Sequence, residues 1–431
     1  MEEIKGERRK CRQRSCNCLS CRASRYRCGV RLPLLLVVVT ALVCGVLLLL
    51  HRGTLDGAIA SLLKKGDVDQ SNVCGTRQLS DQEAYDRYRR KHADLKIKVL
   101  SERDGAPFLQ SRQPPRNREI TIVTQTSMDR WEHLEKLAAS WGGALCVVVY
   151  LKTRAEIVRA RKRMMWFHDK IEAQGHCRLH LQMVIEEGFK SETEALTASY
   201  PVNALRNVAL SMATTDLVFL LDIDFVPSPG LHEKLTANEN VYADLINRTR
   251  NEGQLLVVPV FEAHRVAWST SQCPTRSIDE PVPQSMQELR ERWQNGYVTA
   301  FHPCHAMAQD ATSYSHFLHP LTTEPYHVHY REFYEPYFIA SQALIPKFDE
   351  RFRGYGKNKA AHAFNCAVQG LSFVVLPEVY MWELPHPRSE FAHQFSKERH
   401  DPCRRAIIDV VYDVFKDELL MNIRQSSASS I

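Results

Sequence analysis

The sequence lacks the compositional extremes of non-globular proteins. Its 431 residues include only 18 Gly and 20 Pro, and no segment repeats at a period of about 20 to 50 residues. Hydrophobic residues make up 44% of the chain and charged residues 25%, as in folded proteins. Collagen-like, repeat and wholly disordered structures are therefore excluded. The length allows one large domain with appendages, or two domains.

The body of the chain also lacks positive charge. The net charge is +6, but the first 31 residues carry ten Lys or Arg against three Glu, a local charge of +7. Residues 32–431 therefore sum to −1. A nucleic-acid-binding surface has no support in this composition, and the excess positive charge belongs to an N-terminal tail.

One long hydrophobic run follows this tail. Residues 32–50 (LPLLLVVVTALVCGVLLLL) contain no charged side chain, and a helix of this length spans roughly 28 Å, close to the hydrocarbon core of a bilayer. A cleaved signal peptide is the alternative, but the run is longer than usual and lacks a small-residue cleavage pattern. Because the basic tail favours the cytosol, we expect a single-pass type II membrane protein with a lumenal body.

The remaining sequence divides into a stem and one patterned domain. Residues 51–117 have scattered charge and one helical segment near 80–100, which is typical of a stem. The stiff segment 112–116 (RQPPR) precedes strongly patterned sequence, so we place a domain boundary at residue 118. The domain is expected to extend to residue 424, and the Ser-rich residues 425–431 to form a disordered tail.

The cysteines divide along the same boundaries. Five lie in the tail, one in the apolar run and seven beyond it. The tail cysteines suit acylation or zinc binding, and we favour acylation or free thiols because their C-x-C-x-x-C spacing lacks a second C-x-x-C pair. Seven lumenal cysteines leave at least one free or bonded to another chain, which allows a homo- or hetero-oligomer. A sequon makes Asn247 a candidate glycosylation site.

From residue 119 onward, short apolar runs alternate with helical segments. The expected strands are 119–124, 145–151, 179–185, 216–221 and 255–260, and the expected helices lie near 130–140, 153–173 and 203–213. This alternation predicts an α/β domain with a mostly parallel, Rossmann-like central sheet. Ligands of such sheets bind at the carboxyl ends of the strands.

Two carboxylates follow the expected strand 216–221. Asp222 and Asp224 stand at i and i+2, which point to the same side of an extended chain and suit one divalent cation. Adjacent acids at the end of an apolar strand are costly unless they are neutralised. An exposed acidic turn with helix capping is the alternative, but the apolar residues before the pair and the turn at 226–230 (VPSPG) favour a cation site.

Two reactions use such a strand end. In a haloacid-dehalogenase-type phosphatase the first Asp is the nucleophile, but that motif stands early in its domain and a second acidic pair follows. In an A-type glycosyltransferase the cation holds the diphosphate and neutralises charge on the leaving nucleotide. The late position of the motif and the expected type II topology favour the glycosyltransferase. A non-catalytic lumenal carbohydrate-binding protein is a third alternative, against which the intact D-x-D argues.

Several segments together carry a family resemblance. They are 200–209 (YPVNALRNVA), 222–231 (DIDFVPSPGL), 257–262 (VVPVFE), 312–315 (TSYS), 334–338 (YEPYF) and 348–359 (FDERFRGYGKNK). Over about residues 120–395 the chain resembles the LARGE-like glucuronyltransferases of glycosyltransferase family 49, and its layout is similar to the single-domain β-1,4-glucuronyltransferase type. The resemblance implies an inverting A-type glycosyltransferase of the Golgi membrane that uses Mn²⁺, a UDP-sugar donor and a glycan acceptor on a glycoprotein.

The resemblance also implies which residues bind metal and nucleotide. His386 in the segment 382–387 (WELPHP) matches the late histidine that is the third metal ligand of the family, beside Asp222 and Asp224. The expected nucleotide contacts lie at the end of the first strand and on one face of the helix before the D-x-D strand. They are Thr124, Gln125, Thr126, Asn203, Arg206 and Asn207. For the helix residues, a helix cap and a surface salt bridge are the alternative.

The catalytic base and the donor sugar are the remaining expectations. An inverting transfer needs a carboxylate that deprotonates the acceptor hydroxyl, and the candidates are Asp349, Glu350 and Glu335. Related enzymes place the base after a glycine loop, where this chain has Asn358 and Lys359. For Asp349 and Glu350, an ion pair with a neighbouring arginine is therefore the alternative role. We expect UDP-glucuronic acid as the donor, with Lys359, Arg353 or Lys357 near its carboxylate, and a neutral sugar such as xylose as the alternative. For these three cations, a role as solvated loop charges is the alternative.

Overall fold

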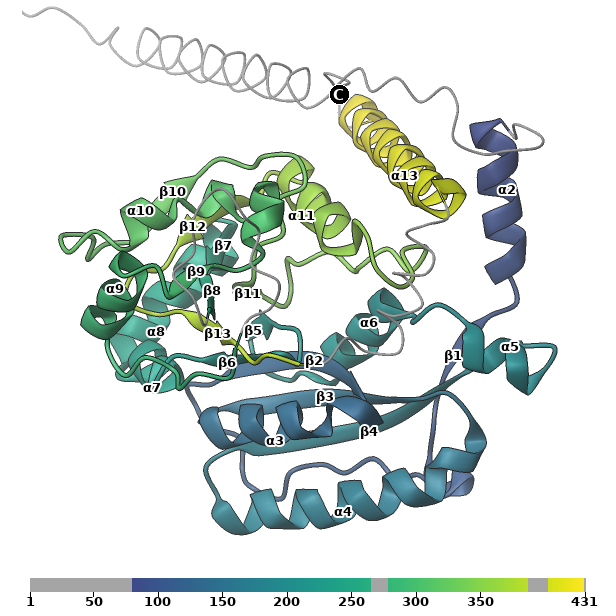
Figure 1. The fold of residues 1–431 in the computed structure, drawn as a ribbon, viewed down its shortest axis with the longest axis horizontal. Coiled ribbons are helices and arrows are strands. Elements are labelled where there is room, and N and C mark those ends of the chain that lie inside the picture. Colours follow the sequence, from purple (N-terminus) through teal and green to yellow (C-terminus); the bar gives the residue numbers. More distant parts are fainter. Residues whose placement is uncertain (1–79, 265–277, 387–401, 430–431) are drawn as a thin grey trace, which may run out of the picture. The chain divides into compact units, whose positions relative to one another are not determined.

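The computed structural model describes residues 80–264, 278–386 and 402–429. Within them a nine-stranded mixed sheet has the order β1-β4-β3-β2-β5-β11-β7-β12-β10 (Figure 1). Its strands are β1 (Lys96–Val99), β2 (Ile120–Ser127), β3 (Ala144–Leu151), β4 (Arg178–Glu187), β5 (Leu217–Leu220), β7 (Gln254–Val257), β10 (Tyr326–Val328), β11 (Phe338–Ser341) and β12 (Ser372–Val375). Strands β4, β3, β2 and β5 are parallel, whereas β1, β10 and β11 pair antiparallel with their neighbours.

The parallel half of the sheet confirms the alternating pattern of the sequence. Its strand β3 is apolar and buried throughout, and β2 is buried except at its last residue, as expected where helices cover both faces of a parallel sheet. Helices α3 and α4 lie along one side and α6 along the other (Figure 1). The helices are α2 (Asp81–His92), α3 (Trp131–Ser140), α4 (Ile157–Gln174), α5 (Glu192–Thr197), α6 (Val202–Met212), α7 (Leu231–Thr236), α8 (Glu239–Ile246), α9 (Met286–Gln294), α10 (Tyr314–Phe317), α11 (Asn358–Val368) and α13 (Pro402–Ser429).

A second sheet joins segments that are far apart in the sequence. It has the order β6-β13-β8-β9, with β6 (Phe225–Pro227), β8 (Val260–Ala263), β9 (Val298–Ala300) and β13 (Met381–Glu383). The expectation of one strand over 255–260 is therefore wrong, because this run is divided between β7 of the large sheet and β8 of the small one. Pro259 lies between them and has no N–H to donate to a ladder.

The folded body also includes residues before 118 and after 424. Strand β1 pairs with β4, and Leu109 forms an isolated bridge with Leu181. β1 is a short edge strand with two lysines, a composition that protects sheet edges but gives little apolar signal. At the other end, α13 continues through the Ser-rich segment to Ser429.

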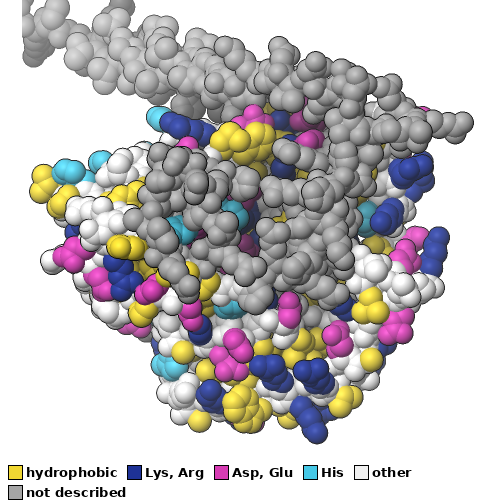
Figure 2. Space-filling view, in the orientation of Figure 1, with side chains coloured by type: hydrophobic (Ala, Val, Ile, Leu, Met, Phe, Trp, Pro, Cys, Tyr) yellow, Lys and Arg dark blue, Asp and Glu magenta, His cyan; other side chains and the backbone are white. Residues whose placement is uncertain are grey.

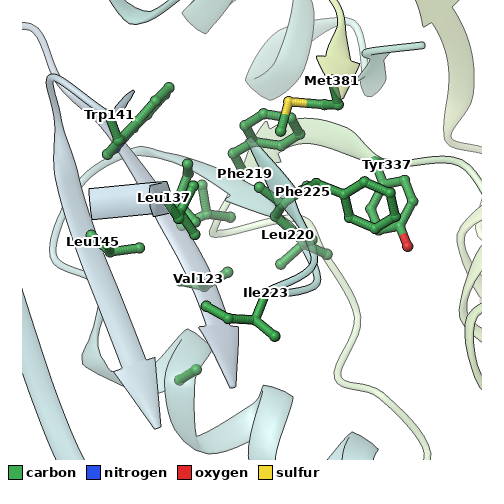
Figure 3. Close-up of a cluster of buried hydrophobic side chains, with 14 of the residues drawn as sticks. Val123, Leu137, Trp141, Leu145, Phe219, Leu220, Ile223, Phe225, Tyr337 and Met381 are labelled. Carbon is green, nitrogen blue, oxygen red and sulfur yellow. The ribbon is translucent and has the colours of Figure 1, made fainter. Parts of the chain in front are cut away.

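The apolar residues that alternate with the two acids anchor the D-x-D turn in the core. Ile223 and Phe225 are buried, and they belong to a cluster that includes Val123, Leu137 and Tyr337 (Figure 3). Since Ile223 and Phe225 point into this cluster, the acids at 222 and 224 are held at its edge.

The membrane expectation concerns residues that the structure does not describe. The run 32–50 lies outside the described residues, as do the tail cysteines. Among the helices that are described, none is both long enough and apolar enough to cross a bilayer. Cys146, Cys177 and Cys366 are buried free thiols, and burial raises the pKa of Cys146 to about 12.

Candidate active site

The first acid of the D-x-D motif is compensated by three groups from different parts of the chain. One carboxylate oxygen of Asp222 accepts a hydrogen bond from Arg206 of α6 at 2.7 Å. The other accepts from the hydroxyl of Tyr337 at 2.8 Å and from the ammonium of Lys359 on α11 at 3.1 Å. Burial alone would raise the pKa of Asp222, but the adjacent Arg206 and Lys359 outweigh it and hold the pKa well below the ordinary value. Asp222 is therefore an anion at neutral pH.

The second acid faces two histidines. The Oδ2 atom of Asp224 lies 3.3 Å from Nε2 of His386, and Oδ1 lies 3.4 Å from Nδ1 of His133. Arg130 approaches Oδ1 only to 3.8 Å, and this buried oxygen has no hydrogen-bond partner among the described residues. The imidazole rings of His133 and His386 meet edge to face, with centroids 5.6 Å apart.

The second sheet explains why His386 reaches Asp224. Strand β13 pairs with β6 so that Glu383 stands opposite Phe225, and the N–H of Leu384 donates to the carbonyl of Asp224 at 2.8 Å. This pairing therefore places the backbone just before His386 beside the D-x-D turn. The expected proximity of Asp224 and His386 is seen in the structure.

His133 is a site residue that sequence reasoning missed. It comes from α3, directly after the first strand, and no motif spacing links it to the D-x-D pair. Burial lowers the pKa of His133, an effect that the nearby Asp224 opposes only in part. A neutral imidazole thus lies beside the unpartnered oxygen of Asp224, and neutral imidazole is the form that binds metal.

Metal binding by Asp222, Asp224 and His386 stays a prediction. Among the described residues, no three His, Cys, Asp or Glu side chains form a ready-made metal centre. Asp222 is turned toward Arg206 and Lys359, so it does not share a position with Asp224 and His386. The donor set around Asp224, a carboxylate with imidazole on two sides, nonetheless fits the chemistry of Mn²⁺ or Zn²⁺.

The residues expected to contact nucleotide are largely occupied by protein partners. Asn203 donates to the carbonyl of Asp349 at 2.8 Å, and Asn207 donates to the carbonyl of Phe348 at 2.9 Å. These amides tether the 348–350 segment to α6. Arg206 contacts Asn358 at 2.8 Å as well as Asp222; its side chain is only 10% exposed, so it is no surface ion pair.

The end of β2 is buried below the site. Thr124, Gln125 and Thr126 are all less than a tenth exposed. The side chain of Gln125 accepts a hydrogen bond from Tyr200, and the hydroxyl of Thr124 is buried without a hydrogen-bond partner among the described residues. Their role as nucleotide contacts stays a prediction.

The three candidate bases differ in their surroundings. Asp349 is bound by the guanidinium of Arg351 at 2.7 Å, which is the alternative role considered for it. Glu350 accepts from Asn207 at 2.9 Å. Glu335 lies 3.8 Å from Lys359, the residue that also contacts Asp222, and so shares a cation with the D-x-D motif.

The candidate glycosylation site lies elsewhere on the domain. Asn247 is exposed in the π-helical turn Asn247–Asn251 that follows α8. Its side-chain amide donates to Glu252 at 2.7 Å. The hydroxyl of Thr249 donates to the carbonyl of Leu245 and is buried. Glycosylation at Asn247 stays a prediction.

An α/β fold with a mixed sheet and an acidic pair at a strand end that faces a histidine is glycosyltransferase-like. The family model described as "Glycosyl-transferase for dystroglycan" matches residues 166–382, and the chain belongs to this family. Family membership confirms the resemblance in the sequence and favours the glycosyltransferase over the phosphatase alternative.

The individual relatives differ from this chain at most aligned positions and are longer than it. The chain is 32% identical over 306 residues to the xylosyl- and glucuronyltransferase LARGE2 of Rattus norvegicus, covering 71% of this chain and 40% of that protein. It is 28% identical over 300 residues to the glycosyltransferase-like protein gnt14 of Dictyostelium discoideum, covering 69% and 42%. The chain thus spans about two fifths of the length of these relatives.

The similarity to solved structures is weaker. The crystal structure of GalNAc-T7 with UDP, GalNAc and Mn²⁺ has 10% sequence identity and a TM-score of 0.35, covering 62% of this chain and 44% of that chain. The crystal structure of S. aureus TarS 1-349 in complex with UDP-GlcNAc has 14% identity and a TM-score of 0.31, covering 64% and 60%.

The low pKa of Asp222 predicts a defined acid dependence of stability. A carboxyl group whose pKa is depressed in the folded state stabilises the protein above the unfolded pKa, and this contribution is lost as the pH falls toward the folded pKa. Below about pH 4, the free energy of unfolding of the wild type should fall relative to Asp222→Asn by up to about 1.4 kcal/mol per pH unit. Urea denaturation between pH 5 and 3 in EDTA measures it.

The control for this prediction is Asp417→Asn, which alters an exposed carboxylate on α13. Its stability should follow that of the wild type over the same pH range. Parallel curves for the wild type and Asp222→Asn would contradict the electrostatic account of Asp222.

Proposed function

We propose that this chain is a metal-dependent, inverting glycosyltransferase that transfers a sugar from a UDP-sugar to a glycan on a glycoprotein. The observation that carries the proposal is the arrangement around the D-x-D turn: Asp224 faces His386 and His133, while Asp222 is paired with the cations Arg206 and Lys359. A site that holds two carboxylates, two cations and two imidazoles suits a ligand that brings its own negative charge together with a metal.

The residues proposed to hold the metal are Asp224 and His386, with His133 beside Asp224; Asp222 would join them on exchanging its contacts with Arg206 and Lys359. Support comes from the buried Oδ1 of Asp224, which has no hydrogen-bond partner among the described residues, and from the neutral imidazole of His133 beside it. Mn²⁺ bound there would supply a Lewis acid that neutralises the charge on the leaving diphosphate.

Arg206, Lys359 and the start of α11 are proposed to receive the donor. A helix N-terminus presents free N–H groups and a positive dipole to an anion, and α11 begins at Asn358 directly after a glycine-containing loop. The ammonium of Lys359 lies 3.1 Å from Asp222, so it is placed to exchange this carboxylate for a phosphate or a sugar carboxylate of the donor.

Glu335 is proposed as the base. Its side chain is 27% exposed, so an acceptor hydroxyl can approach it. In an inverting transfer, the acceptor oxygen forms a bond to the anomeric carbon, the bond from that carbon to the phosphate oxygen breaks, and the electron pair leaves with UDP. The carboxylate of Glu335 would take the hydroxyl proton.

The base assignment predicts a selective kinetic effect. Glu335→Gln removes the proton acceptor but keeps the side-chain volume, so kcat should fall by about 10²- to 10⁴-fold with little change in KM. The matched control is Glu350→Gln, whose carboxylate contacts Asn207 and should matter less. Equal losses in the two variants, or none in Glu335→Gln, would remove Glu335 from this role.

The metal assignment predicts that Asp224→Asn lowers kcat/KM by at least about 100-fold, which corresponds to about 2.7 kcal/mol of transition-state stabilisation. The amide keeps the size of the side chain but removes the charge. Mn²⁺ titration of turnover, together with Mn²⁺ binding followed by electron paramagnetic resonance, measures the effect. The exposed Asp244→Asn is the control, and wild-type turnover in Asp224→Asn would contradict the mechanism.

Glucuronic acid is the proposed donor sugar. The expected cation for its carboxylate is Lys359, and the named relatives include xylosyl- and glucuronyltransferases. A neutral sugar such as xylose is the second candidate, because those names include both activities. The two differ in whether the site must compensate a sugar carboxylate.

A competition assay with UDP-glucuronate and the UDP derivatives of xylose, glucose and galactose distinguishes these donors. We expect preferred use of glucuronate and a loss of this preference in Lys359→Ala, since a charged hydrogen bond contributes about 1.5 to 3 kcal/mol. Preference for a neutral sugar that Lys359→Ala leaves unchanged would assign the neutral donor.

The proposed location is the Golgi membrane, with residues 32–50 as the anchor and the catalytic domain in the lumen. The +7 charge of the first 31 residues and the apolar run support it. Protease added to intact Golgi vesicles should remove the tail and spare residues 118–431. Digestion of those residues in sealed vesicles would reverse the topology.

A further inference from the structure

The C-terminal helix α13 lies beyond the part of the chain that matches the family model, which ends at residue 382. It packs against α11 and α2 (Figure 1). Val411, Tyr412, Phe415 and Leu420 are buried, and Tyr412, Phe415 and Leu420 lie at the i, i+3, i+8 spacing of one helix face. The helix is thus an integral part of the domain.

This helix contacts the loop that precedes α11. We call residues 353–357 (RGYGK) the glycine loop. Its Gly356 has φ +107°, and a β-carbon added there would lie 3.3 Å from Cγ2 of Ile408 on α13. Lys357 has φ +54° although it is not a glycine. A non-glycine residue keeps this unfavourable conformation only where its surroundings enforce it.

The surroundings of Lys357 come mainly from α13. Its ammonium lies 2.7 Å from the carboxylate of Asp409 and 4.7 Å from the ring centre of Tyr412. Phe333 contributes a second ring at 5.1 Å. A lysine enclosed by a carboxylate and two aromatic faces is fixed by charge and by cation–π attraction.

The same helix holds two further segments of the site. Arg351, two residues before the glycine loop, donates to Glu418 at 2.7 Å and also contacts Tyr85 of α2. Lys416 pairs with Glu332 at 2.8 Å, three residues before Glu335. The segments that carry Lys359 and Glu335 are therefore both attached to α13.

Lys357 connects this attachment to the D-x-D motif. It directly precedes α11, where Asn358 accepts from Arg206 at 2.8 Å and Lys359 contacts Asp222 at 3.1 Å. We propose that α13 is a positioning helix for the donor site: Asp409 and Tyr412 hold Lys357 so that the glycine loop and the first turn of α11 are preformed for the UDP diphosphate. This inference rests on the proposed function and adds a positioning element to it.

The test measures donor affinity in the full-length chain. Asp409→Asn should raise the donor KM and the UDP dissociation constant in saturating Mn²⁺ by roughly 3- to 30-fold. Turnover at saturating donor and the affinity for Mn²⁺ alone should stay within about twofold of the wild type. Asp409→Glu should restore most of the donor affinity. Asp417→Asn, the same change at an exposed position of α13, should leave all these values unchanged.

Lys357→Gly separates positioning from stability. Glycine relieves the positive φ, which offsets stability lost with the ammonium that Asp409 and Tyr412 enclose, so the thermal midpoint should change little while the donor KM increases. Unchanged donor affinity in both Asp409→Asn and Lys357→Gly would overturn the inference and leave the proposed function standing. A wild-type chain that binds no UDP with Mn²⁺ would overturn the proposed function and the inference with it.

Discussion

The placement of two carboxylates at the end of a buried strand is the constraint on which the site depends. The side chains of Asp222 and Asp224 are only 20% and 25% exposed, and largely buried anions must be compensated. The compensation comes from segments that are distant in the sequence: Arg206 from α6 and Lys359 from α11 for the first acid, and His386 with His133 for the second. The two acids are thus equipped for different tasks.

This constraint also accounts for the small sheet and the tethered loop. Asp224 and His386 are far apart in the sequence, and the pairing of β13 with β6 brings them together. On the other side, Asn203 and Asn207 bind the backbone of residues 348–349. The side chain of Arg206 extends from α6 to Asn358 at the start of α11. Three segments thus meet at the site: the D-x-D turn, the residues after β13, and the loop that leads into α11.

The sequence was informative where burial leaves a periodic signal. The apolar runs at β2, β3, β4 and β5 predicted the parallel half of the sheet, and the acids that end the last of these predicted the site. It was uninformative where tertiary contact decides: Pro259 divides a continuous apolar run between two sheets, and β1 carries lysines at an edge. His133 has no local motif, and the tethering role of Asn203 and Asn207 depends on a loop about 145 residues away.

The binding of UDP to the full-length chain, with and without Mn²⁺, tests the central claim most directly. Isothermal titration should show UDP binding in Mn²⁺ and at least tenfold weaker binding in EDTA. A UDP concentration of about 100 times the dissociation constant should add about 2.7 kcal/mol to the stability of the Mn²⁺-loaded protein. UDP affinity that is indifferent to Mn²⁺, or no UDP binding at all, would contradict a metal-dependent nucleotide-sugar site.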